Sequence, residues 1–356
     1  MNLNPILPTP PIPAAQPAEP VRAVPQVIGA TAVKALLADL TEISAAIEAE
    51  PQPAAPNQAL KAALQDAIGR QNGLAPLLAD LAQGLKSGAL PPRVQQAALQ
   101  LVAQAPPLAQ DVTGPAVQQA LLRSGLFLES RLARLPADEP LGDDLKAALL
   151  SLRAALRATG EAPSRPPGRP PAPPFRDAPT TGQPSAQPSL PKDASPALVA
   201  GRLSAETDAA LARHELLQIA SLPLQSPDRM VDDIAARWMF EAPVQTPQGQ
   251  SVAQFEISRD GAGPGRPVDA PPVWRARFSL DVEPLGPVHA SLALSGDDAR
   301  VVLWAERGET VQRLRSFESG LRLGLALAAL KPEISIYAGA PPPPAPRSGR
   351  FLDQTL

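Results

Sequence analysis

The sequence predicts an α+β domain near the C-terminus, with an antiparallel or mixed sheet and one long amphipathic helix, behind an arm of short α-helices and Pro-rich disordered segments. Proline accounts for 47 of the 356 residues and is concentrated in a few stretches, where it prevents regular helices and central strands. All three tryptophans and the single tyrosine follow residue 237, so we expect the densest core there. Beyond Asp228 the apolar period changes from 3.6 to 2, which indicates strands.

The arm begins with a disordered tail, residues 1–29, and continues as a helical region rich in Ala and Leu, residues 30–160. Most of its helical patterns are closed by Gly or Pro. They cover Thr31–Glu50, Gln58–Arg70, Leu74–Lys86, Pro91–Gln104, Pro115–Leu135 and Gly142–Thr159. Two interpretations stay open: a loose bundle, or helices that form only on a partner.

Residues 161–203 are predicted to be a Pro-rich disordered linker, because 161–200 hold 12 prolines and no apolar period. A helix over 204–226 follows, with Ser204 as its N-cap. Residues 227–340 form the predicted α+β domain, and 341–356 form a Pro-rich tail.

Alternation of apolar and polar residues predicts the strands of the domain. They are Trp238–Val244, Val252–Arg259, Trp274–Val282, Val288–Leu294, Arg300–Glu306 and Glu333–Ala338. A helix from Gly308 to Leu330 precedes the last strand, with an inner stripe of Val311, Leu314, Phe317, Leu321, Leu325 and Ala328. We expect Trp274 to start a central strand and to be buried. Strands followed by one helix and a final strand predict a helix packed on a sheet.

Composition excludes several functional classes. A net charge of −3 gives no attraction for a phosphate backbone, so we expect no nucleic-acid partner. The absence of cysteine excludes disulfides and thiolate metal sites. No apolar run is long enough to span a bilayer, and the first residues lack the pattern of a cleaved signal peptide. We expect a monomer without cofactor or small-molecule substrate.

Candidate catalytic and metal motifs are weak. His214 would need a second imidazole at the position of Gln218 to hold zinc on a helix, so we interpret it as a helix-surface residue. His289 lies on the polar side of a strand and is expected to be solvated. The Gly-rich stretch 261–267 is followed by prolines rather than by the helix that a dinucleotide loop requires. Acidic pairs such as Asp297 and Asp298 fall in turns. We expect no enzyme.

The turn Pro284-Leu285-Gly286-Pro287 joins two strands of the predicted sheet. Proline presets φ and glycine supplies a positive φ, so turn chemistry explains most of it. Leu285 is different, because an apolar turn tip is also a plausible docking anchor. Both interpretations stay open.

Several segments of the C-terminal region form a recognisable series. They are Arg237–Pro243 (RWMFEAP), Ala253–Ile257 (AQFEI), Trp274 with its strand, Leu285–Val288 (LGPV), Ala299–Ala305, and the helix carrying Leu314 and Leu321. In this order they resemble the flagellar hook-length control family. In the arm, 122–132 (LRSGLFLESRL) is similar to a stretch that recurs in such proteins.

The resemblance implies flagellar hook-length control by a protein made in the cytoplasm and secreted through the flagellar type III apparatus. The arm would contact hook and hook-cap subunits. The C-terminal domain would contact the cytoplasmic domain of an export-gate protein and switch export from hook to filament substrates. The candidate partner-binding residues are Pro284, Leu285, Gly286, Val301 and Leu303. The alternative is a non-enzymatic envelope or cytoskeletal scaffold that binds partners through its Pro-rich linker.

Overall fold

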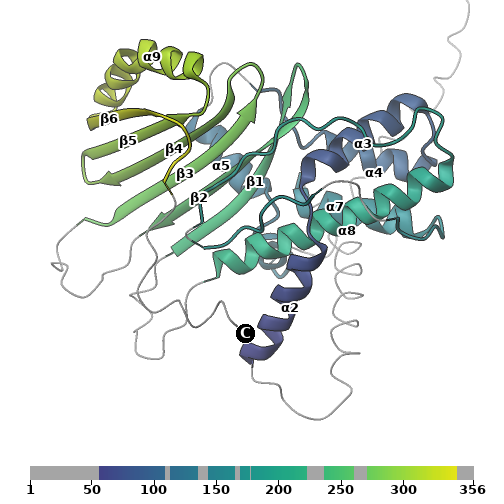
Figure 1. Cartoon of the computed structure of the whole chain (residues 1–356). Helices are drawn as coiled ribbons and strands as arrows, with labels where there is room; N and C mark the ends of the chain where they lie inside the picture. The colour runs from purple at the N-terminus through teal and green to yellow at the C-terminus, as the bar shows by residue number, and fades with distance from the viewer. Residues whose placement is uncertain are drawn as a thin grey trace, which may run out of the picture.

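The computed structural model describes residues 56–108, 113–134, 143–164, 169–176, 178–222, 236–259 and 271–342. The predicted tails at 1–29 and, from residue 343, at the C-terminal end lie outside these ranges, as do the helix predicted at Thr31–Glu50 and the Gly-rich stretch 261–267. A helical part and a sheet lie side by side in Figure 1, with helix α8 running between them. Among the described residues, no helix combines the length and the apolar character needed to cross a membrane.

The helical part follows the predicted patterns closely. It contains α2 (Pro56–Arg70), α3 (Leu74–Ser87), α4 (Pro92–Val102), α5 (Gly114–Arg123), α6 (Leu128–Leu132), α7 (Leu145–Arg157) and α8 (Pro196–Ser221). The pattern predicted over Pro115–Leu135 is two helices, because Gly125 interrupts it with a φ of +89°. The side chain of Thr113 caps α5 and that of Asp144 caps α7, as the N-cap preference predicts.

The largest hydrophobic cluster lies in this helical part, which corrects the expectation that the last third holds the densest core. Its members are almost all Leu, Ala and Val side chains from α3, α4, α7 and α8, and Val252 joins it from the sheet. Small side chains let helix backbones approach closely, so helices without aromatic residues still bury a continuous core. Of the two arrangements left open for the arm, the structure has a packed bundle.

The described residues between 161 and 194 run across the bundle and the sheet and are held there by hydrogen bonds, which differs from the predicted disordered linker. The side chain of Gln71 donates to the Pro171 carbonyl at 2.6 Å, and that of Gln83 donates to the Leu190 carbonyl at 2.5 Å. We call residues 178–190 the strap. Helix α8 begins at Pro196 with Ser195 as its N-cap, so Ser204 is not a cap but a buried residue inside the helix.

The C-terminal part holds a six-stranded sheet in the order β1-β2-β3-β4-β5-β6. The strands are β1 (Ala236–Thr246), β2 (Gly249–Arg259), β3 (Val273–Val282), β4 (Gly286–Ser295), β5 (Asp298–Ala305) and β6 (Lys331–Ala338). Neighbours are antiparallel except β5 and β6, which are parallel and joined through α9 (Gly308–Leu327). The predicted α+β fold with a mixed sheet and one long helix is confirmed.

The two faces of the sheet differ in chemistry. One face carries an aromatic row in which Phe255 lies between Phe240 and Phe278, with centroid distances of 5.0 and 5.6 Å. Trp274 stacks on Trp238 on the same face and remains 38% exposed, so its predicted burial is wrong. Where the opposite face packs against α8 and the strap it carries polar side chains such as Glu241, Gln254 and Ser279.

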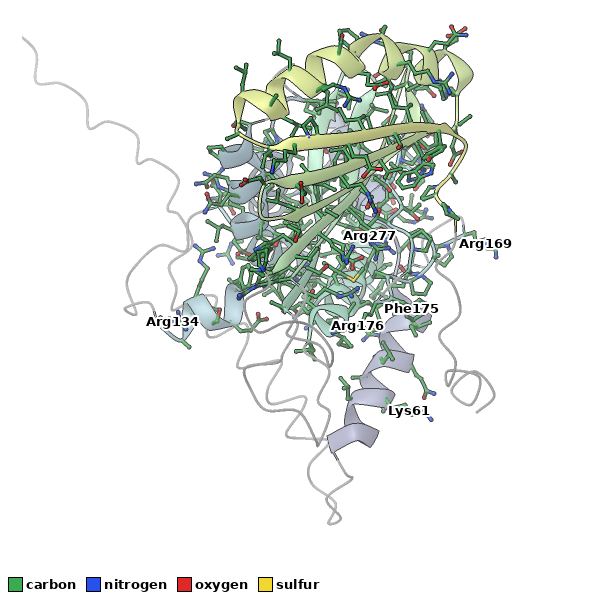
Figure 2. The ribbon with its side chains drawn as sticks, turned by 90° about the vertical axis from the view of Figure 1, so that its left-hand side faces the viewer. Lys61, Arg134, Arg169, Phe175, Arg176 and Arg277 are labelled. Atoms are coloured by element: carbon green, nitrogen blue, oxygen red, sulfur yellow. The ribbon has the colours of Figure 1, made fainter. Side chains whose placement is uncertain are left out.

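Helix α9 lies along β6 at one edge of the sheet, as Figure 2 shows from the side. Its predicted inner stripe is only partly correct. Val311 is buried and Leu314 half-buried, but Phe317 is 64% exposed. The helix packs on β5 and β6 rather than across the sheet, so its first turns contact the strands, whereas Phe317 one turn later is exposed to solvent.

Candidate partner-binding site

The turn between β3 and β4, residues 283–286, has the geometry that its sequence predicts. Gly286 is buried and has a φ of +68°, a conformation that other residues adopt only with strain. A β-carbon at Gly286 would also collide with the Arg307 side chain. The positive φ is the reason for glycine here, and a larger residue would in addition displace the Arg307 side chain.

Two side chains at the start of α9 hold this turn. The Arg307 guanidinium donates to both carboxylate oxygens of Glu283 at 2.6 Å and to the Pro284 carbonyl at 2.9 Å. The Thr310 hydroxyl donates to the Leu285 carbonyl at 2.7 Å. The hydrogen bonds from Arg307 lower the pKa of the Glu283 carboxyl and raise that of the guanidinium itself. The turn is thus fixed in one conformation before any partner arrives.

The predicted partner-binding residues differ in accessibility. Pro284 is exposed and Leu285 is half-buried, so the turn does offer an apolar tip. Leu303 is half-buried on β5 opposite Ala290, whereas Val301 is 8% exposed and belongs to the body of the sheet. Val288 pairs with Ala305, so the turn lies close to the C-terminal end of β5. Val301 lies further along β5 and is buried, so it is not available to a partner.

Sequence reasoning missed the residues that hold the turn. The contacts of Glu283, Arg307 and Thr310 define the conformation of the turn, but no local pattern around these residues predicts this role. A bidentate Arg–carboxylate pair is a specific arrangement, but the two partners stand 24 residues apart. Only the fold shows that the start of α9 lies beside this turn.

A chain of polar side chains lies behind the turn on the polar face of the sheet. Ser279 Oγ lies 2.6 Å from His289 Nδ1, and Glu306 Oε1 lies 3.4 Å from His289 Nε2. His289 is buried, so its predicted solvation is wrong, because the strap covers this face. Burial raises the pKa of the neighbouring Asp281 carboxyl.

The order serine, histidine, carboxylate resembles a hydrolytic triad, but the hydrogen bonds are those of a structural site. Ser279 is fully buried, and its hydroxyl donates its only proton to the Thr180 carbonyl at 2.7 Å. That proton is therefore not directed at His289, as general-base activation of a nucleophile requires. The chain of hydrogen bonds connects the strap to the sheet.

The histidine of the zinc-like pattern is also buried rather than on a helix surface. Burial lowers the pKa of His214 to about 3, so its imidazole is neutral in α8. Gln218, at the position of the missing second ligand, accepts from Lys146 at 2.8 Å and donates to Glu129 at 3.1 Å. Within the described ranges, no group of three or more His, Asp and Glu side chains could hold a metal ion.

The arm stretch 122–132 packs at this same place. Gly125, at a positive φ, contacts Lys146 and His214 so closely that a β-carbon would lie 2.5 Å from Lys146 Cβ and 3.0 Å from His214 Cε1. Glu129 pairs with Lys146, and Leu128 is fully buried. In this structure the stretch joins α6, α7 and α8, and its conformation depends on Gly125.

Residues 266–345 match the family model described as flagellar hook-length control protein FliK. Comparison with curated proteins and with solved structures gives no match. The matched range contains β3 to β6, α9 and the turn held by Arg307 and Thr310. The resemblance to the flagellar hook-length control family that the sequence predicts is thus confirmed for residues 266–345.

Proposed function

We propose that this protein controls flagellar hook length, and that its C-terminal domain switches type III export from hook to filament substrates. The match of residues 266–345 to the flagellar hook-length control model carries this proposal. The partner of the domain would be the cytoplasmic domain of an export-gate protein. The arm would contact hook and hook-cap subunits during its passage through the growing structure, and the protein would be secreted.

The turn at residues 283–286 is the docking element that the geometry supports best. It places exposed Pro284 and half-buried Leu285 at the end of a hairpin. Arg307 and Thr310 hold backbone and side-chain acceptors of the turn, so little conformational entropy remains to be lost on binding. An apolar side chain on a turn that is already ordered can anchor a partner at a low entropic cost.

The arm has features that suit export as an unfolded chain. It contains no cysteine, so no disulfide has to be reduced before threading. Fully stretched at about 3.3 Å per residue, residues 1–226 would reach on the order of 750 Å, a scale suited to measuring an assembly. Threading would have to unfold the bundle of α2 to α8 and detach the strap from the sheet.

A regulatory role without catalysis is the consistent interpretation of the buried polar groups. The one arrangement that resembles a catalytic triad among the described residues has its serine buried and hydrogen-bonded to the strap. The scaffold alternative requires an accessible Pro-rich linker to bind recognition modules. Thr180, Gln183 and Leu190 of that linker are buried, which disfavours the alternative for this segment.

Substituting Leu285 tests the proposal directly. Leu285→Ala should leave the sheet folded, because the side chain is half-buried and the turn is held through its backbone carbonyl. We expect cells with this variant to carry overlong hooks without filaments, measured by electron microscopy of isolated hook–basal bodies.

Two comparisons make the result interpretable. Leu323→Ala, at an exposed leucine of α9, is the matched control and should leave hook length unchanged. Deletion of the gene should reproduce the overlong hooks. Hooks of ordinary length in the deletion strain would overturn the proposed function, whereas ordinary hooks in Leu285→Ala alone would exclude only the turn as the docking element.

A further inference from the structure

Strands β2 and β3 separate before either of them ends. Their pairing runs from Arg259 opposite Trp274 to Gln254 opposite Ser279. Beyond this point β2 continues to Gly249 and β3 continues to Val282 without pairing to each other. The two strands therefore form a fork with backbone groups facing into it.

The strap fills this fork as a short extra strand. Gln183 N donates to the Val252 carbonyl at 2.8 Å, and Val252 N donates to the Gln183 carbonyl at 2.9 Å, an antiparallel bridge. Thr181 N donates to the Gln254 side chain at 2.7 Å, and the hydroxyls of Thr180 and Ser279 lie 2.7 Å apart. Addition of an extended segment to unpaired strand backbone is a recurrent mode of peptide recognition.

Gly182 passes close to the backbone of β3. A β-carbon at this position would lie 2.7 Å from Asp281 N and 2.8 Å from Leu280 Cα. These are backbone atoms of a strand and cannot move aside at low cost. The fork therefore accepts an extended segment only when glycine passes β3.

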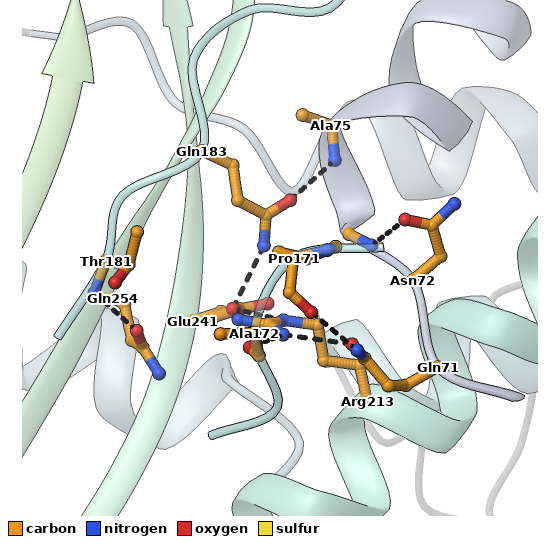
Figure 3. Close-up of polar contacts among 11 residues, drawn as sticks. Gln71, Asn72, Ala75, Pro171, Ala172, Thr181, Gln183, Arg213, Glu241 and Gln254 are labelled. Atoms are coloured by element: carbon orange, nitrogen blue, oxygen red, sulfur yellow. Dashed lines mark hydrogen bonds and ion pairs between the residues drawn. The ribbon is translucent and has the colours of Figure 1, made fainter. Parts of the chain in front are cut away.

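The strap also makes hydrogen bonds with helix α3 of the arm. Figure 3 shows the Gln183 side chain between the two halves of the molecule, donating to Glu241 at 3.0 Å and accepting from Ala75 N at 3.1 Å. Further along the strap, the Ser189 and Leu190 amides donate to Asp80 of α3. Unfolding α3 and α8 would remove these contacts with the arm, and the strap would keep only its anchors on the sheet.

We propose that the fork between β2 and β3 is a strand-accepting site, that strap residues 180–183 are its built-in occupant, and that withdrawal of the arm opens it. This inference rests on the proposed function for the event that withdraws the arm. Once the strap leaves, the backbone N–H and C=O of Val252 lose their partners, and unpaired buried backbone groups strongly favour a replacement. The replacement would be an extended segment with glycine at the position of Gly182.

The test uses the full chain with Gly182→Val, which should force the strap out of the fork. Thr181→Val is the matched control, because its exposed side chain lies next to Gly182 and the substitution keeps the backbone N–H. Hydrogen exchange measured by NMR or mass spectrometry should show the Val252 and Gln183 amides exchanging at least about tenfold faster in Gly182→Val than in the wild type. The control should exchange like the wild type.

A labelled synthetic peptide of residues 178–190 then tests whether the open fork accepts a strand. It should bind the Gly182→Val chain by fluorescence anisotropy, and a peptide that itself carries Gly182→Val should not. The wild-type chain should bind neither, because its tethered strap competes at a high effective concentration. Unchanged exchange at Val252, or equal binding of both peptides, would overturn the proposal.

A second variant covers the case in which Gly182→Val does not fold. Gln183→Ala keeps the backbone bridge and removes only the side-chain contacts to Glu241 and Ala75. It should give a smaller rise in exchange at Val252, and no rise would count against the proposal. The exchange and peptide results do not depend on hook length. Ordinary hooks in the deletion strain would therefore overturn the proposed function and leave the proposal of a strand-accepting site between β2 and β3 unaffected.

Discussion

Glu206 is a buried acid at the junction of α8, α3 and the strap. Burial, followed by repulsion from the Asp80 carboxylate, raises its pKa to about 9, while Arg202 acts in the opposite direction. Asp80 accepts hydrogen bonds from the Ser189 amide and hydroxyl at 2.5 Å and from the Leu190 amide at 3.2 Å, so this carboxylate holds the strap against α3. Glu206 must then stay protonated at neutral pH for this junction to remain packed.

This pKa makes stability depend on pH. Between the ordinary glutamate pKa and about 9, the folded chain keeps a proton that the unfolded chain releases, so the free energy of unfolding falls as pH rises. The slope approaches about 1.4 kcal/mol per pH unit for one proton. Glu206→Gln should remove this slope and raise stability at pH 8 by on the order of 2 kcal/mol, measured by urea unfolding at pH 6, 7 and 8.

Glu215 gives the matched control for this prediction, because it is exposed on the same helix. Glu215→Gln should keep the wild-type pH slope. If Glu206→Gln unfolds with the same slope as the wild type, the carboxyl is ionised in the fold and the pair with Asp80 has another role.

At the scale of elements, the aromatic row across β1 to β3 is packed unevenly. Phe240 is fully buried on the edge strand, whereas Phe278 and Trp274 on β3 are 37% and 38% exposed. Trp274 keeps its contacts through Trp238, 6.3 Å away between centroids, and through the Arg259 guanidinium, 5.8 Å above its ring. A ring in this position is stabilised by stacking more than by exclusion from water.

Trp274→Ala should therefore cost only about 1–2 kcal/mol of unfolding free energy, since a stacked, partly exposed ring loses little buried area. Phe240→Ala, at the buried end of the row, should cost roughly 3–5 kcal/mol. Urea unfolding followed by circular dichroism measures both. A loss above about 3 kcal/mol for Trp274→Ala would mean that the ring is covered in solution.

The strands and most helices could be predicted because their apolar periods are local. Val273–Val282 alternates as a half-buried strand should, and Leu74–Ser87 repeats Leu at helical spacing. The strap could not be predicted, because its order comes from partners such as Asp80 and Val252, far from it along the chain. Its proline content excludes a regular helix or a central strand, but it does not show which residues the segment packs against.

The candidate site shows the same division. Leu285 and Gly286 follow from turn chemistry, which is a local rule. Arg307 and Thr310, which hold that turn, belong to a different element and become visible only through the fold. The burial of His214 and His289 likewise depends on the packing of α7 and the strap, which no spacing within one helix or strand reveals.

At the scale of the whole molecule, a buried ion pair connects the arm to the sheet. Arg213 of α8 donates to Glu241 of β1 at 2.7 Å, and both side chains are almost inaccessible to water. The same guanidinium donates to the Gln71 side chain and to the Ala172 carbonyl at 3.0 Å (Figure 3). The Arg213 side chain of α8 thus contacts three other parts of the molecule: the end of α2, the Pro-rich segment and the sheet.

Removing this arginine should separate the unfolding of the two parts. Arg213→Met leaves the Glu241 carboxylate buried without its cation, which costs about 3–5 kcal/mol. All three tryptophans lie in the sheet, at Trp238, Trp274 and Trp304, while most helices lie in the arm, so tryptophan emission and circular dichroism at 222 nm report the two parts separately. In the wild type both signals should change at one urea concentration, and in Arg213→Met the helical signal should be lost first.

The double variant Arg213→Met with Glu241→Gln separates two effects of the single substitution. One is the loss of the attraction between Arg213 and Glu241, and the other is the cost of leaving the Glu241 carboxylate buried without a cation. The double variant has no carboxylate at position 241, and the new amide there still offers the Gln183 side chain an oxygen to donate to. The methionine side chain also fills much of the space of the arginine stem, so the double variant should recover at least about 1 kcal/mol relative to the single one. Coincident emission and dichroism transitions in Arg213→Met, with a loss below about 1 kcal/mol, would show that the arm is held to the sheet by the strap rather than by this pair. That outcome would shift the barrier to arm withdrawal from α8 to the fork between β2 and β3.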